Sequence, residues 1–146
     1  MAINPTVGTR TALTATGIGT LASATYLASS AYTANSNKPV DVIVEAEAAT
    51  TNTPAGNKAL VVFIQTSLDG TNFTSGPTSG TSTTDEGNLV SIGTVPMNSA
   101  SVTQRGEFSI VRVLGFVPYA FKVVVKNDLG VPLTSAAIYT SEISIP

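Results

Sequence analysis

The chain has 146 residues, no His and no Cys, a net charge of −2, and only 11% charged residues. The length fits one domain, and the missing imidazole and thiol groups exclude disulfide frameworks, thiolate nucleophiles and the commonest general base. The seven basic residues are scattered along the chain, which argues against a nucleic-acid surface. We therefore expect a module that acts through its surface, without enzyme activity or cofactors.

Residues 1–18 show no sustained hydrophobic period and are interrupted by Pro5 and Gly8, which indicates an extended N-terminal arm. Residues 11–34 are rich in Thr, Ser and Ala and lack the dense apolar run of a signal peptide. No run approaches the roughly 20 apolar residues of a membrane helix, so we expect no membrane partner. Residues 19–34 contain many Thr and two Tyr residues, which favours one or two strands.

The next two segments have different strand patterns. Residues 40–49 read VDVIVEAEAA and alternate, with Val and Ala on one face and Asp41, Glu45 and Glu47 on the other, as in a half-buried strand. Residues 58–67 read KALVVFIQTS and are apolar on both faces, which is typical of a central strand covered on both sides.

Residues 68–87 form the longest polar stretch, nearly all Ser, Thr and Gly, and a loop of this length is usually functional or disordered. Residues 89–95 and 107–116 are expected strands. Residues 119–126 alternate, with Tyr119 and Phe121 assigned to the core. The final strand is expected at residues 133–145, with the odd-numbered Leu133, Ala137, Tyr139, Ile143 and Ile145 on one face.

No convincing amphipathic helix appears, and turn residues separate about seven or eight strands. Parallel pairing would need helical crossovers, so the sheets should be antiparallel. The sequence thus predicts an all-β, jelly-roll-like sandwich over residues 19–146, preceded by the arm of residues 1–18.

Several residues could bind a metal, act as catalytic carboxylates or stack on sugars, but each has a simpler structural explanation. Asp69, Asp85 and Glu86 offer too few oxygens for a Ca²⁺ site, which needs six to eight, so we expect no bound metal. Glu45 and Glu47 could resemble a glycosidase pair, but a solvated sheet face explains them better. The rings of Tyr26, Tyr32 and Tyr119 could stack on sugars; core or interface packing is the simpler interpretation.

Residues 67–73 read SLDGTNF, a hairpin phrase of the form S-x-D-G-x-x-aromatic. In such a turn Asp69 caps the backbone, Gly70 takes a positive φ, and Phe73 returns to the core. The motif is similar to a sialidase Asp-box but lacks the residue between Asp and Gly. We interpret it as structural.

Several phrases occur together in a familiar order: IGTLASATYLASSAYT at residues 18–33, VDVIVEAEA at 40–48, a P-x-G-N-K turn, the SLDGTNF hairpin, and PYAFKVVVKNDLGVPLT at 118–134. Over most of its length the chain resembles a family of small tailed-bacteriophage structural proteins. None of these motifs is catalytic.

The resemblance implies a capsid decoration (cement) protein on the outer surface of the virion, assembled in the host cytoplasm. Its expected partners are the major capsid protein and further copies of itself, as a homotrimer. Low charge agrees with a surface that a partner covers, and an arm could add a strand to a neighbouring sheet. The residues expected at the interface are Ile3, Pro5, Val7, Arg10, Tyr26, Tyr32, Phe73 and Arg105.

Three alternatives stay open from the sequence. A tail or head-to-tail connector component would be distinguished by a low copy number per particle. A carbohydrate-binding or receptor-binding β-sandwich is favoured by the Ser/Thr/Gly stretch of residues 68–87. A hydrolase is the least favoured, because no nucleophile–base pair is evident.

Overall fold

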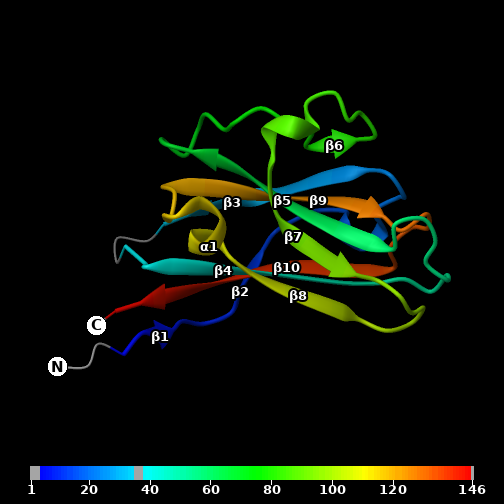
Figure 1. The fold of residues 1–146 in the computed structure, drawn as a ribbon, viewed down its shortest axis with the longest axis horizontal. Coiled ribbons are helices and arrows are strands. Elements are labelled where there is room, and N and C mark those ends of the chain that lie inside the picture. Colours follow the sequence, from blue (N-terminus) through cyan, green and yellow to red (C-terminus); the bar gives the residue numbers. More distant parts are fainter. Residues whose placement is uncertain (1–3, 35–37, 146) are drawn as a thin grey trace.

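Alternating and doubly apolar segments build two antiparallel sheets that pack face to face, and Figure 1 shows this arrangement. The computed structural model describes residues 4–34 and 38–145. Sheet A has β1 (Thr6–Val7) and β2 (Thr11–Leu13) at one edge, followed by β10 (Ser135–Ser144), β4 (Asp41–Ala49) and β8 (Gln104–Ser109). Sheet B runs through β6 (Ser79–Gly80), β3 (Tyr26–Thr33), β9 (Ala120–Asp128), β5 (Ala59–Ser67) and β7 (Val90–Pro96). The predicted all-β antiparallel sandwich is confirmed.

The strand connectivity is that of a jelly roll. Without the two-residue strands β1 and β6, eight strands remain, and β2 pairs with β10, β3 with β9, β4 with β8, and β5 with β7. The first of the eight thus pairs with the eighth, the second with the seventh, and so on, as in one long hairpin rolled into two sheets. Pairing of β10 with β4 and of β9 with β5 completes the sheets.

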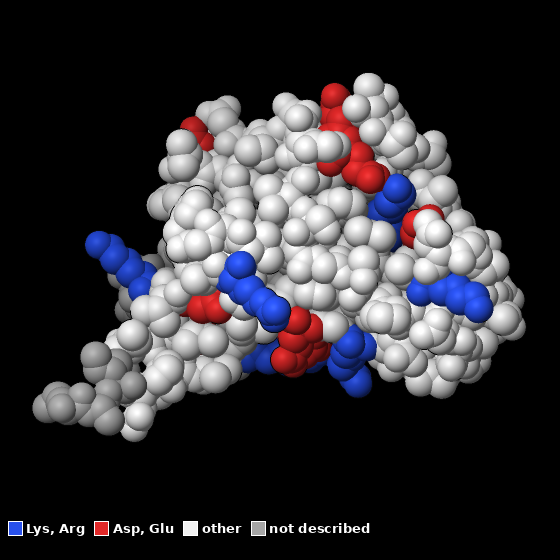
Figure 2. All heavy atoms as spheres, viewed as in Figure 1, with Lys and Arg blue, Asp and Glu red and all other residues white. Residues whose placement is uncertain are grey.

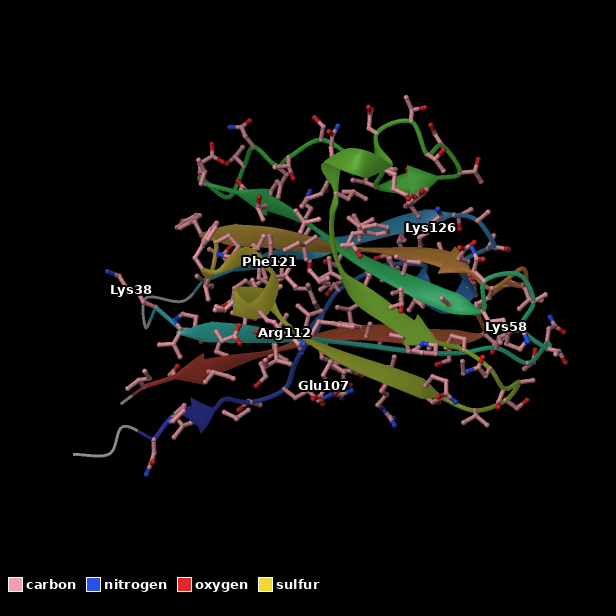
Figure 3. All side chains as sticks on the ribbon, viewed as in Figure 1. Lys38, Lys58, Glu107, Arg112, Phe121 and Lys126 are labelled. Carbon is pink, nitrogen blue, oxygen red and sulfur yellow. The ribbon has the colours of Figure 1, made fainter. Side chains whose placement is uncertain are left out.

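The core between the sheets is filled by the inward faces of the central strands. The alternation predicted for residues 40–49 is confirmed within β4, because Val42, Val44, Ala46 and Ala48 are at most 1% exposed while Glu45 and Glu47 point outward. It is wrong for Val40, which precedes β4 and is 44% exposed. From sheet B, the ring of Phe121 packs against Tyr32 with the ring centroids 4.8 Å apart. Figure 3 shows Phe121 between the two sheets.

The long polar stretch covers the outer face of sheet B. We call residues 68–89 the roof segment. It contains β6 and the short 3₁₀ helix η2 (Glu86–Asn88), and it lies over β3, β9 and β5 (Figure 1). Beneath it Tyr26, Phe63, Leu89 and Val124 form a second buried apolar cluster, which we call the roof cluster. The prediction that β5 is covered on both sides is therefore confirmed, with the roof segment as the second cover.

The strand predicted for residues 107–116 is wrong beyond Ser109. After β8 the chain forms a short helix, α1 (Ile110–Leu114). The Ser109 hydroxyl accepts a hydrogen bond from the Arg112 N–H at 3.0 Å, and Gly115 ends the helix in the left-handed conformation. These two capping residues outweigh the strand preference of the Ile and Val side chains. Of the described helices, none is long and apolar enough to span a bilayer.

The face predicted for the final strand is wrong by one residue. Even-numbered Ile138 and Thr140 point inward, and Tyr139 lies on the outer face. Leu133 is buried but precedes the strand, so the alternation cannot be counted through from that position. The N-terminal residues contribute to the same sheet: β1 and β2 are short, extended and paired with β10. Residues 18–34 form the 3₁₀ helix η1 (Ile18–Thr20) and the single bulged strand β3.

Candidate docking surface

Exposed apolar side chains gather at one end of the sandwich. At this end β3, β5, β8 and β10 finish and β4, β7 and β9 begin, as their pairing registers show. Among the described residues, eight large apolar side chains are markedly exposed, and seven of them lie here. We call this region the apolar end; its members are Val7, Val40, Leu68, Val113, Phe116, Tyr119 and Ile145. The eighth, Val102, lies in the β7–β8 connection at the opposite end.

A rigid turn presents the most exposed of these side chains. Leu68 is 90% exposed and directly follows β5. In the next position Asp69 Oδ1 accepts hydrogen bonds from the backbone N–H groups of Thr71 and Asn72, both at 2.8 Å, and Asp69 Oδ2 accepts one from the Asn72 side chain at 2.6 Å. These bonds hold the pKa of Asp69 well below its usual value. The turn is thus fixed by its own polar groups and offers Leu68 to a partner at little entropic cost.

The SLDGTNF prediction is confirmed in part. Asp69 caps the turn and Gly70 has a φ of +77°, as expected. Phe73, however, does not return to the core: its ring is half-buried on the outer side of sheet B, with Lys122 Nζ 4.4 Å from the ring centroid. A groove of about 500 Å³ runs between Leu68 and Phe73.

Two aromatic side chains extend the apolar end beyond this turn. Phe116 and Tyr119 are 56% and 53% exposed, on either side of the bend that carries the chain from α1 into β9. The prediction that Tyr119 is a core residue is wrong, because β9 begins only at Ala120. The Tyr119 ring instead lies beside the turn: a Cβ placed on Gly70 would be 3.2 Å from its Cε1. Aromatic side chains of this kind are typical anchors of protein interfaces.

Charged side chains are few on the molecule as a whole, at 11% of residues, and several of them lie at the apolar end, among them Lys38 and Asp69. Most of the surface in Figure 2 carries neither acidic nor basic side chains, and a mixed acidic and basic group follows the lower edge, along sheet A. Figure 3 places Lys38 at the apolar end and Arg112 beside Glu107 on the sheet A side. Lys58 and Lys126 lie toward the opposite end.

The residues predicted for an interface fall into three groups. Pro5 and Val7 are exposed and lie near the apolar end, and Phe73, which is half-buried, lies near it as well. Ile3 lies outside the described residues. Arg10 and Arg105 are on the outer face of sheet A. Tyr26 is 1% exposed and Tyr32 is 8% exposed, so both rings belong to the core of this chain and not to its free surface.

The two arginines form a charged row with two glutamates of β4. Arg10 pairs with Glu45 and, at 3.3 Å, with Glu47, and Arg105 Nε donates to Glu47 Oε2 at 2.7 Å. Hydrogen bonding to Glu45 raises the pKa of Arg10 above its usual value. Both carboxylates are therefore engaged by guanidinium groups. Glu45 also lines a shallow cavity of about 300 Å³ together with Glu107 and Tyr139.

The acidic residues considered for Ca²⁺ do not converge. Asp69 uses both of its oxygens within its own turn, whereas Glu86 accepts hydrogen bonds from Tyr26 and, at 2.8 Å, from Lys126 Nζ. Across residues 4–34 and 38–145, no three potential metal-ligating side chains come together.

Sequence reasoning missed Leu68, the most exposed member of the apolar end, and Phe116, the third most exposed after Val7. A signal for both exists in the sequence. Leu68 is an apolar residue inside a turn motif, and Phe116 stands between Gly115 and Pro118 in a connection, where burial is uncommon. Compared with known proteins, the chain matches no protein-family model, and no curated protein matches it.

Proposed function

We propose that this protein is a non-enzymatic structural protein of a tailed-bacteriophage virion, a capsid decoration protein that binds between capsomers on the outer surface of the shell. In this proposal its partners are the major capsid protein and copies of itself, as a trimer. The observation that carries the proposal is the apolar end: among the described residues, a weakly charged sandwich places seven of its eight exposed large apolar side chains in one region. The jelly-roll fold, common among viral capsid domains, supports it by analogy.

The apolar end has the features of a protein interface and not of a pocket for a small molecule. Its anchors, Leu68, Phe116 and Tyr119, stand out from the surface. Rigid presentation limits the entropy lost on binding. In the proposed complex this end, including Leu68 at the start of the roof segment, faces the shell.

A binding assay with undecorated shells tests the proposal. The protein is mixed with shells, the shells are pelleted, and the bound fraction is measured for the natural sequence and for Leu68→Ser and Phe116→Ser. Because central apolar anchors typically contribute about 2 kcal/mol or more, each substitution should weaken binding at least about tenfold. The matched control is Val102→Ser, which changes an exposed Val at the opposite end and should leave binding unchanged.

Native mass measurement of the same samples separates shell binding from self-association. Variants that remain oligomeric but no longer pellet with shells support the assignment of the apolar end to the shell. A protein of natural sequence that never pellets with shells of any tested tailed phage, at concentrations where it is folded, contradicts the proposal. Equal loss of binding in Val102→Ser would contradict the assignment of the surface.

A second candidate is a carbohydrate-binding or receptor-binding module, favoured by the exposed rings of Phe116 and Tyr119, which could stack on sugar faces. A glycan array distinguishes it: sugar binding that Phe116→Ser abolishes, without shell binding, favours the module. A connector role would appear as a single ring of copies in an imaged particle.

A further inference from the structure

The N-terminal strap, which we define as residues 4–13, forms the outer edge of sheet A. Its strand β1 places Thr6 and Val7 opposite Ser144 and Ile143 of β10, and β2 pairs with the middle of the same strand. Between the two short strands the Gly8 N–H donates to the Glu142 carbonyl at 2.7 Å. The strap therefore satisfies the free edge of β10, a ten-residue strand.

Little apolar surface holds the strap in place. Residues 4–12 are all exposed, and Leu13 is half-buried. A cleft of about 420 Å³ separates the strap from β3, and its walls include Tyr32 and Glu142, whose side chains share a hydrogen bond of 2.6 Å. Because the strap is attached mainly through backbone hydrogen bonds at a sheet edge, opening it costs far less than unfolding the sandwich.

One side chain gives the strap a specific anchor. The guanidinium of Arg10 lies 3.2 Å from the centroid of the Tyr139 ring, on the outer face of β10. Arg10 also pairs with Glu45 and Glu47 of β4. An aromatic floor and two carboxylates form a cradle that fits a planar guanidinium better than an ammonium group.

The connection behind the strap can act as a hinge. Residues 14–17 join β2 to η1, and Gly17 has a φ of +89°, a conformation that glycine adopts without strain. Beyond it Ile18 and Leu21 are buried in the core. A change of backbone direction within residues 14–17 would break the 2.6 Å hydrogen bond from the Ser30 N–H to the Thr14 carbonyl and move Ala15 off the core, but would leave Ile18 and Leu21 in place.

We propose that the strap is an exchangeable strand, which leaves its own β10 and docks on β10 of a second copy of this chain, with Arg10 seated in the partner's Tyr139, Glu45 and Glu47 cradle. The inference rests on the self-association named in the proposed function and is independent of shell binding. Exchange restores every contact that opening removes, so its cost is small. Each exchanged strap also raises the effective concentration of the next contact.

The occupant of the open edge is a second copy because the edge fits this strap in particular. A strap of the same sequence restores both the register on β10 and the guanidinium contact in the cradle. On the opposite side of the sandwich β7 and β8 approach each other closely: the ring of Phe108 packs on Gly93 and Gly106, where an added Cβ would overlap it at Gly93 and lie 2.9 Å from it at Gly106. A cavity of about 430 Å³ lies beside Phe108, but no described segment of this chain pairs with a strand edge there as the strap pairs with β10.

Cross-linking between singly substituted copies tests the exchange, since the natural chain has no Cys and engineered thiols are unique. Thr6→Cys protein is mixed with Ser144→Cys protein, incubated, and treated with a short bifunctional thiol reagent. These positions face each other across the β1–β10 pair, at about 5 Å between Cβ atoms. We expect at least about tenfold more covalent heterodimer than in the control mixture of Thr6→Cys with Val102→Cys.

A chain carrying both Thr6→Cys and Ser144→Cys completes the test. The proposal is overturned if two results occur together: the doubly substituted chain cross-links only within itself, and the mixture gives no more heterodimer than the control mixture. Arg10→Ala in the Thr6→Cys chain should speed the approach to the final heterodimer yield about fivefold, and Arg10→Lys should give an intermediate rate. Equal rates for all three would overturn the role of the cradle. Because no shells are present, failure here is distinct from failure of the proposed shell binding.

Discussion

The two outer faces of the sandwich meet solvent in opposite ways: one is charged and open, and the other is apolar and covered. The outer face of sheet A is left open and carries the charged row of Arg10, Glu45, Glu47 and Arg105. The outer face of sheet B is apolar and is covered by the roof segment, residues 68–89. A long stretch of Ser, Thr and Gly can therefore serve as a structural cover when the strands beneath it are apolar on both faces.

The roof segment is attached to sheet B mainly by hydrogen bonds and makes few apolar contacts with it. The Gln65 side chain donates to the Thr74 carbonyl at 2.8 Å, and the Ala28 N–H donates to the Thr78 carbonyl at 3.0 Å. Leu89 supplies the main apolar contact. On sheet A the equivalent positions need no cover, because glutamates alternate with the buried residues of β4.

The largest effect should come from emptying the roof cluster. Phe63 is 6% exposed on the outer side of β5, and Phe63→Ala should lower the free energy of unfolding by about 3–5 kcal/mol, through lost burial and a cavity. On sheet A, Ile43 is half-buried, so Ile43→Ala should cost about 1 kcal/mol. Urea denaturation measures both; equal costs would show that the roof segment does not cover sheet B in solution.

A smaller effect should follow from crowding the roof segment itself. Gly76 has a φ of +147°, and a Cβ at that position would overlap Leu89, so Gly76→Ala should cost about 1–3 kcal/mol. Gly87 in the same segment has open space around it, and Gly87→Ala should stay within about 0.5 kcal/mol. Hydrogen exchange should show faster exchange of the roof segment in the Gly76 variant. Unchanged exchange in both variants would contradict the close packing of Gly76 on Leu89.

The smallest effect should come from removing single charges. The dependence of the free energy of unfolding on pH then distinguishes the two faces. Lys126 and Tyr26 lower the pKa of Glu86 below its usual value of 4.5, so its stabilisation is complete above that pH and is lost as the pH falls through the lower folded value. Glu86→Gln should cost about 1 kcal/mol at neutral pH and flatten the loss of stability in acid. At the alkaline end, Glu86 raises the pKa of Lys126 above 10.5, so that contribution is lost as the pH rises through the raised value.

The matched change on the open face is Glu47→Gln. Its arginine partners are 47% and 59% exposed, so the cost should be below about 1 kcal/mol and should shrink further in high salt. Thermal unfolding across pH and salt measures both variants. The comparison would be contradicted if Glu47→Gln lowered the free energy of unfolding more than Glu86→Gln did and if this loss did not shrink in high salt.

The local patterns of the sequence were enough to predict the fold class. Alternation in residues 40–49 and the doubly apolar run in 58–67 correspond to β4 and β5, because burial of one or both faces of a strand leaves a period-2 or continuous signal. The helix α1 escaped prediction because its five residues are strand formers held by capping groups, Ser109 and Gly115. The face of β10 was wrong because alternation was counted from Leu133, before the strand begins.

The candidate surface was less predictable than the fold. Pro5, Val7 and Phe73 do lie near the apolar end. Whether Tyr26 and Tyr32 face a core or a partner depends on which residues cover them. That cover comes from distant parts of the chain: Phe121 packs on Tyr32, and the roof segment covers Tyr26. Patterns within single strands carry no information about such cover.

The position of β10 constrains the order in which the molecule can assemble. This strand lies between β2 and β4, and its bond to Thr6 joins groups 138 positions apart in the chain. Sheet A therefore cannot close on a nascent polypeptide until residues 135–144 have been made. Such non-local pairing is typical of folding times of milliseconds to seconds, and a chain that stops before residue 135 would leave two unpaired strand edges exposed to aggregation.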